Sequence, residues 1–173
     1  DPKLARLIED VKAREHDGFS YDGAEASFEL LARRTLHSVP EYFFLNSFRV
    51  ITERRFNAKG ELVTMSEAVV KLDVKHHSAV TVGEGNGPVN ALDDALRAAL
   101  LPVYPQLKDV RLVDYKVRIL TPEEGTKAVT RVMIESADDA GNRWATVGVS
   151  ANVIDASYNA LHDSITWKLF HAG

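Results

Sequence analysis

The clearest candidate for chemistry is a glycine-rich turn between an apolar strand and a helix, Val80-Thr-Val-Gly-Glu-Gly-Asn-Gly-Pro-Val-Asn90. Glycines at the start of a helix let an anion approach the free backbone N–H groups there. A dinucleotide does not match, because the third glycine of G-x-G-x-x-G would fall at Pro88 and no βαβ pattern surrounds the turn. The carboxylate of an amino acid, held beside Val89 and Leu92, is a better match. The alternative is that the glycines only permit a tight turn.

The other polar residues do not form a catalytic or metal-binding pattern. None of the six histidines shows H-x-H or H-x-x-x-H spacing with an acidic partner, and no serine stands at a telling distance from a histidine. Three carboxylate pairs are expected on solvated faces, namely Asp93-Asp94, Glu123-Glu124 and Asp138-Asp139. We therefore expect no catalytic residue, no metal ligand and no cofactor in this chain.

The glycine-rich segment occurs twice. Residues 145–161 repeat residues 80–96 after 65 positions, with identical residues at Thr81/Thr146, Val82/Val147, Gly83/Gly148, Ala91/Ala156, Ala95/Ala160 and Leu96/Leu161. Before each copy, apolar and polar residues alternate as they do in half-buried strands, and after each glycine the apolar residues follow helical spacing. We predict two pseudo-repeated βββα units, residues 42–104 and 108–170.

Residues 1–40 show a different pattern. Apolar residues at helical spacing predict two short helices, residues 3–16 and 24–34. Two such helices bury little surface by themselves, so we interpret residues 1–40 as a helical linker subdomain and residues 41–173 as one domain. The expected fold class is α+β. Because the chain begins Asp1-Pro2 without a methionine, we also expect it to be part of a longer protein.

Composition argues against several classes of partner. A net charge of −4 gives no electrostatic reason to bind nucleic acid or an anionic membrane. No apolar run reaches the length of a membrane span, and the chain has no cysteine, so it has neither a disulfide framework nor thiolate chemistry. We expect a cytoplasmic protein with no nucleic acid or membrane partner.

Three segments together carry a resemblance to a known family: Gly85-Asn-Gly-Pro-Val-Asn-Ala91, Val113-Asp-Tyr115 and Gly148-Val-Ser-Ala-Asn-Val-Ile154. With the duplication, they resemble the C-terminal allosteric and dimerisation domain of the isopropylmalate, homocitrate and citramalate synthases. Residues 18–31 resemble the linker subdomain of the citramalate synthase branch in particular.

The resemblance implies a feedback domain that is not itself catalytic. The parent protein would be an acyltransferase that condenses acetyl-CoA with a 2-oxo acid, pyruvate in the citramalate branch, on the route to isoleucine. The partners implied are a second copy in a homodimer, the protein's own N-terminal catalytic domain and a branched-chain amino acid effector. A divalent metal is expected only in the catalytic domain.

In that family the effector lies where the units of a dimer meet. Carried over by motif, its contacts would be Val89, Asn90, Leu112, Tyr115, Ile119 and Ile154. We add Leu92 as an apolar contact and Asp114 as a partner for the ammonium group. Isoleucine is the expected effector. The alternatives are a 2-isopropylmalate synthase domain that binds leucine, a dimerisation scaffold without a ligand, and, more remotely, an independent enzyme.

Overall fold

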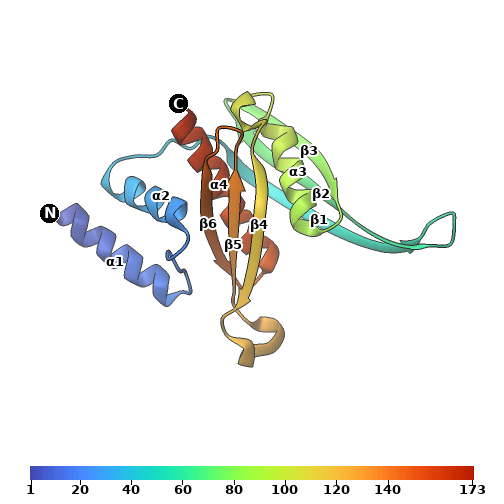
Figure 1. Ribbon diagram of the computed structural model, residues 1–173, viewed down its shortest axis with the longest axis horizontal. Helices are drawn as coiled ribbons and strands as arrows, with labels where there is room; N and C mark the ends of the chain where they lie inside the picture. The colour runs from blue at the N-terminus through green and yellow to red at the C-terminus, as the bar shows by residue number, and fades with distance from the viewer. The chain divides into compact units, whose positions relative to one another are not determined.

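The computed structural model describes residues 1–173 apart from the side chain of Thr126. It confirms the predicted α+β class, with two helices followed by two βββα units (Figure 1). The elements in chain order are α1 (Pro2–His16), α2 (Glu25–Leu36), β1 (Phe44–Phe56), β2 (Leu62–Val74), β3 (His77–Gly85), α3 (Pro88–Leu100), η1 (Pro105–Leu107), β4 (Arg111–Ile119), η2 (Pro122–Lys127), β5 (Thr130–Ala137), β6 (Arg143–Ser150) and α4 (Val153–Ala172).

The chain divides into two compact units. The first-repeat unit comprises residues 41–108 and holds the antiparallel sheet β1-β2-β3 with α3. The second-repeat unit comprises residues 109–173, with the sheet β4-β5-β6 and α4, together with residues 1–40. The helices α1 and α2 thus group with the second repeat. The division into a linker at 1–40 and one domain at 41–173 stays a prediction.

The repeated Thr-Val-Gly sequence fixes each helix to its sheet in the same way. The Thr81 hydroxyl donates to the carbonyl of Ala95 at 2.7 Å, and the Thr146 hydroxyl donates to the carbonyl of Ala160 at 2.7 Å. A side chain at Gly83 would collide with the backbone of α3, since a Cβ there would meet atoms of Ala91 and Ala95. The glycine is therefore required for close strand–helix packing.

In the first-repeat unit, α3 covers one face of the sheet. The core lies between them, where Val70, Leu72, Leu92 and Leu96 are fully buried. Strand β2 begins at Leu62, earlier than the sequence pattern indicated, because β1 and β2 pair as far as Phe56 and Leu62. Since β3 ends opposite Ser66, this part of the hairpin projects as a two-stranded ribbon (Figure 1).

In the second-repeat unit, α4 packs on β5 and β6, and α2 packs on β6 and α4. Ser27 of α2 bonds to both β6 and α4. Its hydroxyl accepts from the backbone N–H of Val147 in β6 at 3.0 Å and donates to Asp163 Oδ2 in α4 at 2.8 Å. The segment that precedes α2 lies on the sheet face away from α4, where Arg131 Nε donates to the Gly18 carbonyl at 2.7 Å. Among the described residues, no helix has both the length and the apolar character needed to cross a membrane.

Candidate functional site

The three glycines before α3 differ in how closely other atoms approach them. Gly83 and Gly85 lie where a Cβ would collide with α3, in the second case with Asn90 and the N–H of Ala91. Gly87 has no atom near such a Cβ and an extended backbone, with φ of −147° and ψ of 170°. None of the three lies in the left-handed region, so the tight-turn explanation does not account for them.

The two repeated helices differ at their first turn. In α4, Asn152 Oδ1 accepts from the backbone N–H groups of Ile154 at 2.9 Å and Asp155 at 3.1 Å. The corresponding residue in the first repeat is Gly87, and no side chain among the described residues caps α3. Pro88 at the first helical position has no N–H to offer. Among the described residues, the first backbone N–H groups of α3 therefore lack a side-chain acceptor, and such a helix start favours an anion.

Three of the residues predicted to contact the effector lie on α3. Val89 is half-buried and Asn90 is exposed, both on the first turn. Leu92 is fully buried in the core between α3 and the sheet. The structure thus leaves the first two accessible from the helix start and gives Leu92 a packing role.

Asp93 was expected on a solvated face, and that prediction is wrong. The residue is only 9% exposed, its Oδ2 accepts from Arg97 Nε at 2.9 Å, and its Oδ1 is buried without a hydrogen-bond partner among the described residues. Burial raises the pKa of this carboxyl group. An unsatisfied carboxylate oxygen is costly, so the position favours a bound donor. Asp93 follows Val89 by four residues, which places both on one side of α3.

Strand β4 brings three predicted residues to one face through a bulge. Leu112 pairs with Ser136 and Asp114 with Glu135, so the register shifts at Val113. In regular alternation, Leu112 and Tyr115 would point to opposite faces. The shift places Leu112, Tyr115 and Ile119 together on the face that α4 covers elsewhere in the sheet.

Tyr115 links this face to the start of α4. Its hydroxyl lies 2.8 Å from Ser157 Oγ, and Ser157 also donates to the Val153 carbonyl at 2.7 Å. The main packing of α4 is on β5 and β6, and apolar side chains along β4 stay partly exposed as a stripe. The exposed fractions are 39% for Tyr115, 45% for Val117 and 55% for Ile119. Ile154, also predicted to contact the effector, is half-buried on the first turn of α4.

Asp114 points away from this stripe. It lies 3.3 Å from Lys116 in an ion pair and lines a hollow of about 240 Å³ with Asp22 and Glu135, among others. Its Oδ1 accepts from the backbone N–H of Tyr115 at 2.9 Å, while the Tyr115 side chain lies on the opposite face of the sheet. Asp93, unlike Asp114, has a buried oxygen that lacks a donor.

Sequence reasoning missed Asp93 and Ser157, although the repeat contained a signal for both. Ser157 corresponds to the core residue Leu92, so a polar side chain at this position was worth attention. Asp93 corresponds to Tyr158, whose pKa is raised mainly by burial. Among the described residues, no three His, Cys, Asp or Glu side chains gather as a metal site would require.

Comparison with known proteins indicates the same family as the sequence motifs. Residues 22–169 match a family described as the LeuA allosteric (dimerisation) domain. The chain is 49% identical over 169 residues to an (R)-citramalate synthase of Geobacter sulfurreducens, which covers 98% of this chain and 31% of that protein. It is 46% identical to an (R)-citramalate synthase of Aquifex aeolicus over 97% of this chain and 31% of that protein. It is also 34% identical to a 2-isopropylmalate synthase of Aquifex aeolicus, over 57% of this chain and 17% of that protein. The chain thus spans under a third of the length of these relatives.

Proposed function

The chain belongs to the family of LeuA allosteric (dimerisation) domains, and on that premise we propose that it is the feedback-regulatory domain of a citramalate synthase. Its ligand is a branched-chain amino acid, isoleucine, and it forms a homodimer in the cytoplasm. The rest of the parent protein condenses acetyl-CoA with pyruvate and holds the divalent metal. Binding of the effector changes catalysis by a coupling free energy of about 1–3 kcal/mol.

The observation that carries the proposal is the pair of charge-binding features on α3. The uncapped helix start attracts a carboxylate, and one turn later the buried Oδ1 of Asp93 lacks a donor. A free amino acid supplies both missing charges, a carboxylate and an ammonium group. In this proposal the effector's carboxylate accepts from the amides of Val89 and Asn90, and its ammonium group donates to Asp93 rather than to Asp114.

The open stripe on β4 is the second feature that supports an apolar effector. Its aromatic and aliphatic side chains, Tyr115, Val117 and Ile119, are exposed although they are of types that proteins usually bury. A branched aliphatic side chain is the chemistry that such a surface favours. The stripe and α3 belong to different units of the chain.

Calorimetric titration with isoleucine and leucine tests the proposal. We expect isoleucine to bind, and Asp93→Asn to weaken binding at least tenfold because an amide cannot neutralise an ammonium group. Asp94→Asn is the matched control, because Asp94 is the exposed neighbour on the same helix and accepts from the N–H of Glu84 at 3.2 Å. Loss of binding in both variants, or in neither, contradicts the assignment of Asp93.

The same titration separates the alternatives. Tighter binding of leucine would place the chain in the 2-isopropylmalate synthase branch, and the two ligands differ only in a methyl position worth about 1–3 kcal/mol. No heat with either amino acid, together with an unchanged thermal unfolding temperature, would favour a scaffold without a ligand, since a ligand of the folded state must raise stability.

A further inference from the structure

The bend between β3 and α3 contains the pair Asn86-Gly87. In such a pair the backbone nitrogen of the glycine lies close to the side-chain amide of the asparagine and can attack it, because glycine has no side chain to hinder the approach. Of the seven asparagines in the chain, Asn86 is the only one followed by glycine. The second repeat has Ala151-Asn152 at the corresponding positions, so the pair belongs to the first repeat alone.

The structure leaves this pair unrestrained. Strand β3 ends at Gly85 and α3 begins at Pro88, so neither a sheet ladder nor a helix holds the peptide between Asn86 and Gly87. Asn86 is exposed, and within the described part of the chain neither its side-chain amide nor the N–H of Gly87 forms a hydrogen bond. A Cβ at Gly87 would have no atom within 4 Å. The rotation that brings the nitrogen onto the amide carbon therefore breaks no contact.

Several other asparagines have side chains that are held in place. Asn57 Nδ2 donates to Glu61 Oε2 at 2.9 Å, and Asn142 Nδ2 donates to Asp138 Oδ2 at 3.0 Å. Asn152 Oδ1 accepts from two backbone N–H groups of α4. Each of these residues is also followed by a residue with a side chain. They are internal references for an asparagine that is both restrained and hindered, in contrast to the one in the bend before α3.

We propose that Asn86 deamidates spontaneously and that the carboxylate so formed closes the start of α3 to other anions. The nitrogen of Gly87 loses its proton and bonds to Cγ of Asn86, the Cγ–Nδ2 bond breaks, and the amide nitrogen leaves as ammonia. Water then opens the resulting succinimide ring. Cleavage between the nitrogen and Cγ gives aspartate, and cleavage between the nitrogen and the main-chain carbonyl carbon gives isoaspartate. Either product carries a carboxylate in place of a neutral amide, and water is the one co-reactant.

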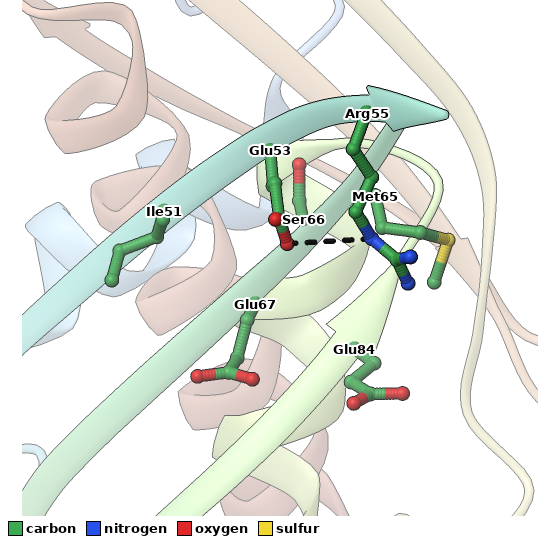
Figure 2. Close-up of a pocket in the computed structure, with 7 residues that line it drawn as sticks. All are labelled: Ile51, Glu53, Arg55, Met65, Ser66, Glu67 and Glu84. Atoms are coloured by element: carbon green, nitrogen blue, oxygen red, sulfur yellow. Dashed lines mark ion pairs between the residues drawn. The ribbon is translucent and has the colours of Figure 1, made fainter. Parts of the chain in front are cut away.

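The charges around the bend direct the new carboxylate toward α3. Glu84, two residues before Asn86, lines a hollow of about 380 Å³ together with Glu53 and Glu67 (Figure 2). These carboxylates repel a further negative charge, whereas the first turn of α3, which no side chain among the described residues caps, attracts one. The product carboxylate thus takes the place that the proposed function gives to the carboxylate of the effector. This consequence rests on the proposed function, and the deamidation itself does not.

Ageing of the chain in mildly alkaline buffer tests the site, because loss of the proton from the Gly87 nitrogen starts the reaction. Peptide mass spectrometry of samples taken over time measures the conversion of every asparagine. We expect Asn86 to convert at least tenfold faster than any other asparagine, and at least tenfold more slowly in Gly87→Ala, where a Cβ hinders the attack. The inference is overturned if Asn86 converts no faster than the others, or if Gly87→Ala converts at the parent rate.

Calorimetric titration with isoleucine tests the consequence. Asn86→Asp carries the product charge from the start and should bind isoleucine at least tenfold more weakly than the parent, whereas Asn86→Gln keeps a neutral amide and should bind as the parent does. Thermal unfolding shows that each variant is folded. Equal binding by both variants overturns the closing of the helix start. A parent chain that binds no isoleucine contradicts the proposed function and the closing together, while the conversion rates still decide the Asn86 site by themselves.

Discussion

At the scale of single residues, Gly83 shows how the repeat constrains side-chain size. A Cβ at Gly83 would meet the backbone of Ala91 and Ala95, whereas one at Gly87 would meet nothing within 4 Å. We predict that Gly83→Ala destabilises the chain by about 3 kcal/mol or more, since a helix backbone must move away from the strand. Gly87→Ala should cost less than about 1 kcal/mol. Urea unfolding of both variants measures the difference, and equal losses would contradict the packing role of Gly83.

Asp138 is a second residue with a structural role that can be measured. A hydrogen bond from Lys168 Nζ at 2.7 Å and others from Asn142 lower the pKa of Asp138 to about 2. Because the folded pKa lies below the unfolded one, its stabilisation is complete above about pH 5 and is lost as the pH falls toward 2. The shift corresponds to about 2 kcal/mol.

We therefore predict that Asp138→Asn is about 2 kcal/mol less stable than the parent at pH 7 and that the difference shrinks as the solution is acidified. Chemical unfolding at several pH values between 7 and 3 measures this. A constant difference at every pH would mean that the ionised carboxylate contributes nothing specific.

Burial of individual charges was the least predictable feature at this scale. Asp93 and Asp138 each have an exposed acidic neighbour, and adjacent carboxylates suggested solvated faces. Which of two neighbours is buried depends on the rotation of α3 for Asp93 and on the turn before β6 for Asp138. The sequence specifies neither the rotation of α3 nor the geometry of that turn, although the alignment of Asp93 with Tyr158 indicated a buried position for Asp93.

At the scale of elements, periodicity predicted the helices and strands well and the bulge in β4 not at all. The stripes of α3 and α4 follow from 3.6-residue spacing, and their attachment follows from the repeated Thr and Gly. The bulge at Val113 has no glycine or proline to announce it. It results from pairing with β5, and it decides that Leu112 and Tyr115 share a face while Asp114 does not.

The residues that precede α3 and α4, Gly87 and Asn152, can each be replaced by the residue type of the other. We predict that Gly87→Asn supplies α3 with its own cap, raises stability by a few tenths of a kcal/mol and weakens isoleucine binding, because the amide oxygen occupies the site of the carboxylate. Asn152→Gly should lower stability by a similar amount and leave binding unchanged. Calorimetry and thermal unfolding measure both effects. If Gly87→Asn binds isoleucine as the parent does, the start of α3 does not hold the carboxylate.

At the scale of the whole molecule, the grouping of α1 and α2 with the second repeat was not foreseeable from the sequence. It depends on contacts between residues far apart in the chain. Ser27 bonds to Val147 and Asp163, and Glu29 Oε2 accepts from Trp167 Nε1 at 2.7 Å. No local pattern specifies such pairs, and the amphipathic helices indicated only that some surface must cover them. In the structure, α2 packs on β6 and α4, and α1 packs on α2.

This grouping predicts how the chain responds when residues 1–40 are removed. Val147 would lose its cover and its backbone N–H would lose the Ser27 acceptor, so the second-repeat unit should open more easily while the first-repeat unit is unaffected. Hydrogen exchange of the shortened chain should accelerate in β6 and α4, by about tenfold or more for each 1.4 kcal/mol lost, and stay unchanged in β2 and β3. Ser27→Ala, which leaves one buried N–H without its acceptor, should accelerate the same segments less, at a cost of about 1–3 kcal/mol. Faster exchange spread evenly over both sheets, or none in β6, would show that α1 and α2 are not part of the second-repeat unit.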